Sequence, residues 1–174
     1  IKSFAHHAPA DVLLVIKQHP LDSGLVAWGR LIRRLAKDYG VADRIHYLSD
    51  WDIAAVVKNA IGVVTVNSTV GTLALNSGKP VLVLGHAVYK IPGIVSVKGL
   101  DAFWTNPSPP DMALYSAFRQ VLADRGLIRG GLLSDEGLQM LVENAADRLA
   151  PVGRGTRRHL KLVTPQVSDF IASN

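Results

Sequence analysis

The sequence predicts an α/β protein built on a doubly wound parallel sheet. Short runs of Val, Leu and Ile alternate with longer segments whose apolar residues recur at helical spacing. The runs are apolar at consecutive positions, which is typical of strands buried on both faces of a parallel sheet. A polar turn follows most of these runs. The alternation of strand and helix therefore favours a parallel sheet with crossover helices.

The elements are expected at regular intervals along the first 150 residues. We expect strands at 11–16, 44–48, 62–66 and 81–84. We expect helices at 24–39, 51–60, around 73–75, 111–124 and 135–150. Gly40 and Gly78 are expected to end two of these helices. The expected helix caps are Ser49 or Asp50, Ser108 or Asp111, and Ser134. Residues 1–150 are predicted to form one domain and 151–174 a basic tail.

Composition narrows the class of protein. The chain has 174 residues, of which 48% are hydrophobic, enough for a sizeable core and too many for a disordered chain. It has no cysteine, which excludes disulfides and thiolate chemistry. No apolar run reaches the length of a membrane span. The setting expected from these features is cytoplasmic.

The positive charge of the chain gathers at its end. The net charge is +5, and residues 151–174 carry four basic residues and one acidic residue. Such a tail meets an anionic membrane surface or is simply a solvated segment, and both interpretations stay open. Aromatic residues are not interleaved with the basic ones, so we expect no nucleic-acid partner.

The first polar turn follows the first expected strand, at Lys17 to Pro20. Ligands of open α/β sheets bind at the carboxyl ends of the strands, where this turn would lie. Lys17 is suited to a negative charge, and His19 to a phosphate or to acid–base chemistry. Pro20 fixes the backbone. The alternative is a capped strand end with a hydrogen-bonded histidine.

The second polar turn, at 67–72, lies between the central strand and its helix. Asn67 and Ser68 can cap the helix. Backbone N–H groups at the helix start, with the hydroxyls of Ser68, Thr69 and Thr72, suit a phosphate or a carboxylate. Gly71 allows a ligand or a neighbouring strand to come close. The alternative is an ordinary strand-to-helix turn. A third turn, at 85–89, follows the next strand.

Familiar cofactor and catalytic motifs are absent from the sequence. There is no G-x-G-x-x-G after the first strand, no G-x-x-x-x-G-K-[ST], no H-E-x-x-H and no G-x-S-x-G. The adjacent His6 and His7 are weak evidence for a metal. We therefore expect no metal and no cofactor. Phe103 and Trp104 are expected to serve packing rather than to form a sugar platform.

The three turns, in this order, resemble the capsule polysaccharide biosynthesis and export family. Characterised members are retaining β-Kdo transferases that use CMP-Kdo. The stretches that carry the resemblance are V-I-K-Q-H-P-L-D at 15–22, G-V-V-T-V-N-S-T-V-G at 62–71 with A-L-N-S-G-K-P-V at 74–81, L-G-H-A-V-Y-K-I-P-G-I at 84–94, and L-D-A-F-W-T-N-P at 100–107.

The resemblance implies the carboxyl-terminal, Rossmann-like half of a two-domain GT-B glycosyltransferase, with a CMP-sugar donor and a lipid acceptor at the inner membrane. The catalytic acid is expected in a missing amino-terminal domain, so we name no catalytic residue and expect this chain to be inactive alone. The resemblance implies nucleotide binding by Lys17, His19, Pro20, Asn67, Ser68, Thr69, Gly71 and Thr72, and donor-sugar contacts by His86 and Tyr89.

Two other interpretations stay open. One is a non-catalytic sugar-nucleotide-binding or docking module of a capsule export assembly. The other is a UDP-sugar epimerase-like domain, which shares the architecture. Preference for CMP or for UDP would separate the transferase from the epimerase.

Overall fold

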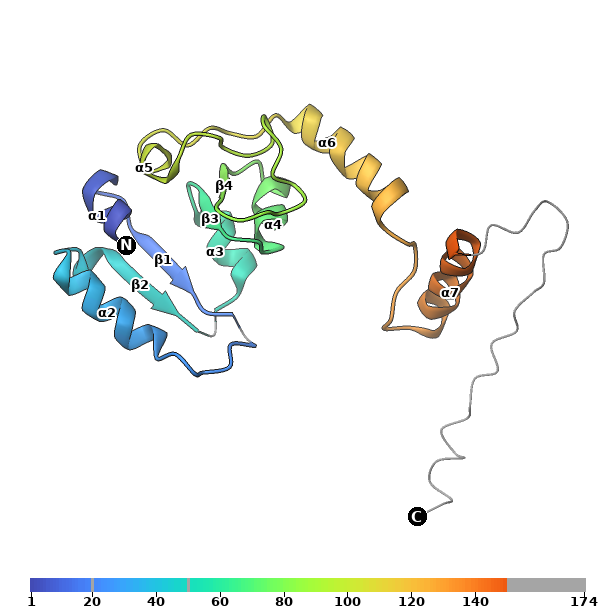
Figure 1. Cartoon of the computed structure of the whole chain (residues 1–174), viewed down its shortest axis with the longest axis horizontal. Coiled ribbons are helices and arrows are strands. Elements are labelled where there is room, and N and C mark those ends of the chain that lie inside the picture. The colour runs from blue at the N-terminus through green and yellow to red at the C-terminus, as the bar shows by residue number, and fades with distance from the viewer. Residues whose placement is uncertain (20, 50, 150–174) are drawn as a thin grey trace, which may run out of the picture. The chain divides into compact units, whose positions relative to one another are not determined.

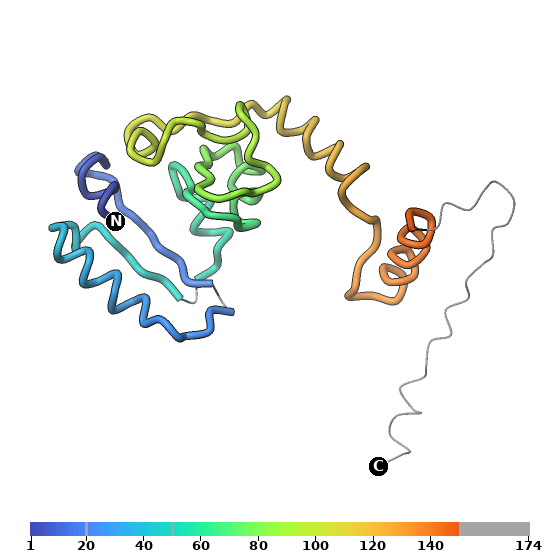
Figure 2. Tube along the Cα trace, in the orientation of Figure 1, coloured from blue at the N-terminus to red at the C-terminus, as the bar shows by residue number. Residues whose placement is uncertain are grey.

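A computed structural model describes residues 1–19, 21–49 and 51–149 of the chain. The described part is a mixed α/β structure. It falls into two compact units, Ile1–Phe118 and Arg119–Asn174, of which the second is described to residue 149. Figure 1 gives the order of the elements, and Figure 2 follows the same path as a Cα trace. The expected boundary between a domain and a tail at residue 150 stays a prediction, because the tail lies outside the described residues.

The first parallel pair of the first unit joins β1, Leu14–Lys17, to β2, Ile45–Leu48. Leu14 lies opposite Ile45, and Lys17 lies opposite Leu48. The connection contains α2, Trp28–Asp38, and a short 3-10 turn at Ala42–Arg44. A Cβ on Gly29 of α2 would lie 3.3 Å from the Tyr47 ring, so α2 covers the face of the sheet that carries Tyr47.

The second parallel pair joins β3, Val63–Thr65, to β4, Val81–Val83. The helix α3, Ile53–Asn59, precedes β3, and α4, Val70–Asn76, connects the two strands. Hydrogen bonding continues past the strands, because Leu84 N donates to Thr65 O at 2.8 Å and Gly85 N to Val66 O at 3.0 Å. The turns that follow β3 and β4 therefore lie side by side.

The strands form two sheets rather than the single doubly wound sheet that we expected. Among the described residues, β1–β2 and β3–β4 are separate two-stranded sheets. The first pair is also less buried than expected: Val15 of β1 is 42% exposed, and Leu13, just before the strand, is 57% exposed. Because successive residues of a strand point to opposite faces, Val15 lies on the face opposite the one that carries Ile16 and Tyr47 and that α2 covers. Of the strands in the described residues, only β4 is buried at every position. A two-stranded sheet with a helix on one face leaves its other face open, which explains the difference.

Several helix boundaries differ from expectation for local reasons. The helix expected from residue 24 begins at Trp28, because Asp22 accepts hydrogen bonds from Gly24 N and Trp28 Nε1 and holds the preceding residues in a turn. The cap of α3 is Asp52, which accepts from Ala54 N at 2.9 Å, rather than Ser49 or Asp50. Asp50 itself lies outside the described residues.

An unexpected helix, α1 at Lys2–His7, packs near α5, Leu100–Phe103. Phe4 is fully buried, and its ring meets Trp104 edge to face with 5.3 Å between centroids. Trp104 Nε1 donates to Ser3 Oγ at 2.7 Å. Phe103 is 4% exposed and lies against Gly62. The expected packing role of Phe103 and Trp104 is confirmed.

The core of the first unit surrounds α4 and β4. Its buried residues are Val57, Ala74, Leu75, Val81, Val83, Ala87, Tyr89, Ile94, Val95 and Tyr115. Tyr115 comes from α6, Met112–Val121, which Asp111 caps by accepting from Ala113 N and Leu114 N. Burial raises the pKa of Tyr89 above its ordinary value of 10.0, and the nearby Tyr115 adds to the rise.

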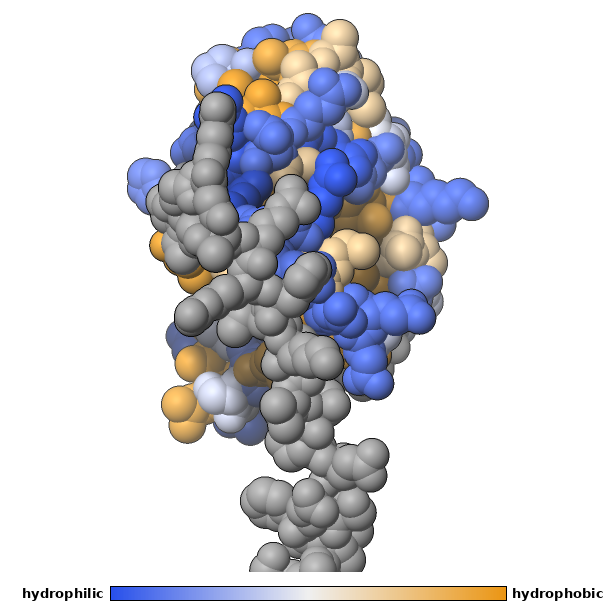
Figure 3. Space-filling model, turned by 90° about the vertical axis from the view of Figure 1, so that its right-hand side faces the viewer, coloured by the Kyte–Doolittle hydropathy of each residue, from blue (hydrophilic) through white to orange (hydrophobic). Residues whose placement is uncertain are grey.

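The second unit contains a π-helical turn, Leu122–Gly126, and α7, Asp135–Leu149. Ser134 caps α7, as expected, by accepting from Gly137 N at 3.1 Å. No residue of α7 is fully buried. Of its expected inner face, Leu141, Val142 and Ala145 are half-buried, whereas Leu138 is exposed. Figure 3 shows hydrophobic residues exposed among hydrophilic ones on one face of the molecule.

Shortening a core leucine tests the position of the core. Leu75 is fully buried, so Leu75→Ala should lower the free energy of unfolding by about 2–5 kcal/mol, through lost burial and a residual cavity. The matched control is Leu25→Ala in the same unit, where the leucine is 90% exposed; it should change stability by less than about 0.5 kcal/mol. Urea unfolding measures both. Equal effects would contradict this core.

The buried Tyr89 predicts a stability loss at alkaline pH. Its pKa is raised in the folded state, so its contribution is complete below the unfolded value near 10 and is lost as the pH rises from there toward the folded pKa. As the pH rises above about 10, the stability of the wild-type chain should therefore fall more steeply than that of Tyr89→Phe. Urea unfolding across that range measures the two slopes, and parallel slopes would contradict the prediction.

Candidate functional site

The end of β1 holds Lys17 in a fixed place. Its Nζ donates to the backbone carbonyls of Gln18 and Ser49, at 3.1 Å each, and so bridges the carboxyl ends of β1 and β2. The side chain is half-buried. An ammonium group has three N–H donors, and these two bonds leave one for a ligand.

His19 follows on the exposed side of the same turn. The backbone N–H of Leu21 donates to His19 Nδ1 at 3.1 Å. Because Nδ1 accepts, the proton of a neutral ring sits on Nε2, which is then a donor toward solvent. Neighbouring Gln18 is held by Tyr47, whose hydroxyl donates to Gln18 Oε1 at 2.6 Å. Pro20, the other residue predicted in this turn, lies outside the described residues.

The turn at 67–72 satisfies most of its own backbone groups. Ser68 N donates to Thr65 Oγ1, and Val70 N donates to Ser68 Oγ, at 3.2 Å each. Thr72 donates twice to Thr69 O, through its N–H at 3.0 Å and its hydroxyl at 2.6 Å. Of the N–H groups that we expected to be free for a phosphate, those of Ser68, Val70, Gly71 and Thr72 are therefore engaged within the turn. Exposed Thr69 and the hydroxyl proton of half-buried Ser68 remain as its polar surface.

Gly71 meets a neighbouring side chain rather than a ligand. It is buried, and its N–H donates to Ser68 O at 3.1 Å. A Cβ at this position would lie 2.5 Å from Cζ and 2.7 Å from Cε2 of Tyr89. The close approach expected here is thus made by the Tyr89 ring, whose hydroxyl also donates to Ser68 O.

The two sugar contacts predicted in the third turn, at 85–89, lie in different surroundings: His86 is exposed and Tyr89 is buried. His86 is exposed and faces solvent, as a ligand contact requires. Tyr89 is 3% exposed and its hydroxyl is already bonded to Ser68 O, so the structure places it in the core instead. Lys90 braces the turn by donating from Nζ to Gly85 O at 2.9 Å.

The structure thus gathers the predicted residues into two groups. Asn67, Ser68, Thr69, Gly71, Thr72, His86 and Tyr89 lie on the adjacent turns after β3 and β4. Lys17 and His19 lie after β1, bonded to the end of β2. Among the described residues, the donors that the two groups leave for an anion include the third N–H of Lys17, Nε2–H of His19, the hydroxyls of Ser68 and Thr69, and the amide of Asn67. Such a set suits a phosphodiester or a carboxylate.

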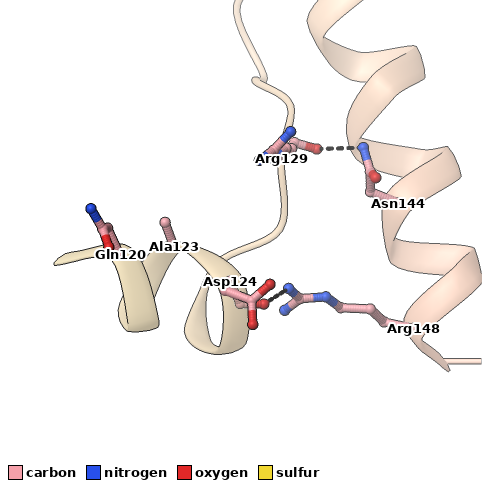
Figure 4. A pocket seen from close by; sticks show the side chains of 6 residues that line it. All are labelled: Gln120, Ala123, Asp124, Arg129, Asn144 and Arg148. Carbon is pink, nitrogen blue, oxygen red and sulfur yellow. Dashed lines mark hydrogen bonds between the residues drawn. The ribbon is translucent and has the colours of Figure 1, made fainter. Parts of the chain in front are cut away.

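A separate hollow of about 460 Å³ lies in the second unit. Its lining comprises Gln120, Ala123, Asp124, Arg129, Asn144 and Arg148 (Figure 4). Arg148 donates to the carbonyls of Asp124 and Arg125, and Asn144 Nδ2 donates to Arg129 O at 3.2 Å. These bonds tie α7 to the preceding segment, which gives the lining a structural role.

Two further tests concern metals and membranes. Within residues 1–19, 21–49 and 51–149, no group of three or more His, Asp or Glu side chains is placed to hold a metal ion. In the same ranges, every helix is too short or too polar to cross a lipid bilayer.

The two tyrosine hydroxyls that brace the turns, Tyr47 and Tyr89, show what sequence reasoning missed. The sequence indicates no role for Tyr47, and the family resemblance implies a sugar contact for Tyr89 rather than a contact with the turn. The available signal was the pair Gly29 and Gly71, each of which lies inside a helix and faces one of these rings. A glycine within a helical pattern often marks a close packing partner.

Comparison with known proteins identifies the family. Residues 1–132 match the family described as capsule polysaccharide biosynthesis protein. The chain is 39% identical over 135 residues to the capsule polysaccharide modification protein LipB of Neisseria meningitidis serogroup A, covering 77% of this chain and 32% of LipB. It is 42% identical over 120 residues to the capsule polysaccharide export protein KpsS of Escherichia coli, covering 69% of this chain and 31% of KpsS.

The chain spans about a third of the length of these curated relatives. No solved structure matches it. The family match covers most of the chain and includes all three polar turns. The chain therefore belongs to the capsule polysaccharide biosynthesis protein family.

Proposed function

We propose that the chain is the donor-binding part of a glycosyltransferase in capsule polysaccharide assembly, and that its donor is a CMP-sugar of the CMP-Kdo type. The observation that carries this proposal is the donor set at the strand ends. Lys17 and His19 supply positive or polar N–H groups, and Ser68 supplies a hydroxyl, in a chain of the capsule family. CMP-Kdo carries a phosphodiester and a carboxylate, which both call for such donors.

Each side chain has a distinct part in the proposed site. Lys17 is pinned by two carbonyls, so its remaining N–H is oriented before a ligand arrives. His19 is exposed and presents Nε2–H to a phosphate or a ribose hydroxyl. Ser68 and Thr69 offer hydroxyls to the phosphate, Asn67 offers its amide, and His86 contacts the sugar. Gly71 and Thr72 contribute by shaping the turn, and Pro20 by fixing the backbone after His19.

The catalytic group is proposed to lie outside this chain. The residues assigned here bind and orient a donor, and none is placed as a nucleophile. Since the matched stretch covers only about a third of each relative, a GT-B arrangement with an additional domain that carries the catalytic acid fits their length. The competing proposals are a docking module of a capsule export assembly, as the name of KpsS suggests, and a UDP-sugar epimerase-like domain.

Calorimetric titration of the 174-residue chain with CMP tests the proposal. CMP should bind more tightly than UMP or UDP. Ser68→Ala should raise the Kd for CMP about 2- to 10-fold, through loss of one neutral hydrogen bond. His19→Ala should raise it about 10- to 100-fold where the bond is to a charged phosphate.

Two matched variants control this titration. His6→Ala removes an exposed histidine of α1, and Ser77→Ala removes an exposed serine just after the end of α4. Both should bind CMP as the wild type does. Tighter binding of UDP would favour the epimerase-like alternative. If neither the chain nor a protein of the relatives' full length binds CMP, the docking module is the better interpretation.

The basic residues of 151–174 are proposed to bring the protein to an anionic inner-membrane surface, where a lipid acceptor would lie. The whole chain should bind vesicles containing about 30% phosphatidylglycerol, and each basic residue near the surface contributes about 1 kcal/mol. A chain ending at residue 149 should bind the same vesicles at least tenfold more weakly, and neither should bind phosphatidylcholine alone. Co-sedimentation measures this, and equal binding of the two chains would contradict it.

A further inference from the structure

We propose that Tyr89 is a positioning residue for the turn at 67–72. Its buried hydroxyl fixes the Ser68 carbonyl, and the fixed carbonyl places the Ser68 and Thr69 side chains for the donor's phosphate. The phosphate as ligand rests on the proposed function. The positioning rests on the geometry of the turn alone.

The Tyr89 hydroxyl has a single proton, and it donates this proton in a hydrogen bond to the turn at 67–72. Tyr89 is 3% exposed and lies in the same buried cluster as Ala74, Leu75 and Val83. A buried hydroxyl requires a hydrogen-bond partner, which here is Ser68 O. The ring cannot turn away from this partner without leaving the core. This hydroxyl could donate a hydrogen bond to a sugar only if its bond to Ser68 O broke.

The Ser68 carbonyl is held from two sides. It accepts from the Tyr89 hydroxyl and from Gly71 N, the latter at 3.1 Å. A carbonyl oxygen has two lone pairs, so both are used. The peptide group between Ser68 and Thr69 is planar and trans, so fixing its carbonyl fixes the orientation of the whole group. The Cα–Cβ directions of both residues then have little freedom.

Gly71 provides the space that this bond needs. Any Cβ at residue 71 would overlap the Tyr89 ring, at 2.5 Å from Cζ. Glycine lowers the stability of a helix, yet one stands in the first turn of α4. The ring therefore lies directly on the turn whose carbonyl it binds. Because Tyr89 follows β4 and Ser68 follows β3, the bond also ties the two strand-end turns together.

The test compares Tyr89→Phe with Tyr115→Phe. Both variants remove one hydroxyl from a tyrosine that is 3% exposed in the same core. The hydroxyl of Tyr115 bonds to Thr72 O, in the last residue of the turn and away from the Ser68 carbonyl, and to Asn76 Oδ1 at the end of α4. The two variants should lose similar stability, so a difference between them in the turn or in binding reports positioning and not general loosening.

Amide hydrogen exchange of the chain without nucleotide is the first measurement. Tyr89→Phe should speed exchange at the N–H of Val70 and Gly71 about 3- to 10-fold, as expected when one hydrogen bond of a turn is lost, and Tyr115→Phe should speed it less than twofold. Exchange at these two amides that is unchanged in Tyr89→Phe, or equally faster in both variants, overturns the inference.

Titration with CMP is the second measurement. Tyr89→Phe should raise the Kd for CMP about 3- to 10-fold at unchanged stoichiometry, while Tyr115→Phe stays within twofold of the wild type. If the wild type binds CMP and Tyr89→Phe binds it equally well, the inference fails and the proposed function stands. If the wild type does not bind CMP, the proposed function fails, and hydrogen exchange alone decides whether Tyr89 holds the turn.

Discussion

The arrangement of the first unit depends on the burial of β4, because this burial fixes the pairing of β4 with β3 and the positions of the turns that follow them. Val81 is fully buried and Val83 is 3% exposed, so β4 has apolar neighbours on both faces, and its ladder to β3 is protected from water. The hydrogen bonds from Leu84 N and Gly85 N extend this pairing beyond the strands. The turns after β3 and β4 therefore have no freedom to separate. Every contact between them, including the one from Tyr89 to Ser68, follows from that register.

The sequence predicts a helix or strand well where the interactions that determine it are between residues close together in the chain. The runs around Val63 and Val81 were placed to within one or two residues, because β-branched residues and flanking glycines are local signals. The caps at Asp111 and Ser134 were equally local. The helix α1 was missed because its one buried side chain, Phe4, depends on Trp104, a hundred residues later. No periodicity within six residues contains that information.

The candidate site shows the same division. The sequence placed Lys17, His19 and Ser68 at the carboxyl ends of strands, and the structure agrees, because strand ends follow from strand positions. The sequence could not say which polar groups the fold would use itself. The Thr72 hydroxyl donates to Thr69 O, and the Gly71 N–H donates to Ser68 O, so neither group is free for a ligand. These hydrogen bonds depend on distances between atoms within one turn, and such distances cannot be read from the amino-acid sequence. The donors left for a ligand are consequently fewer and belong to side chains.

The turn at 17–20 after β1 and the turn at 67–72 after β3 are each held by a tyrosine hydroxyl, but the two tyrosines bind different kinds of group. In each, a tyrosine from the next strand or turn in the chain donates to the turn and packs on a helix glycine: Tyr47 with Gly29, and Tyr89 with Gly71. Tyr47, however, bonds to the Gln18 side chain, whereas Tyr89 bonds to a backbone carbonyl. A side-chain bond can break and re-form as Gln18 changes rotamer, without moving the backbone. A bond to the backbone fixes a peptide plane. The tyrosine thus fixes the backbone of the turn at 67–72, whereas in the turn after β1 the tyrosine fixes the Gln18 side chain and the Lys17 ammonium holds the backbone carbonyls of Gln18 and Ser49.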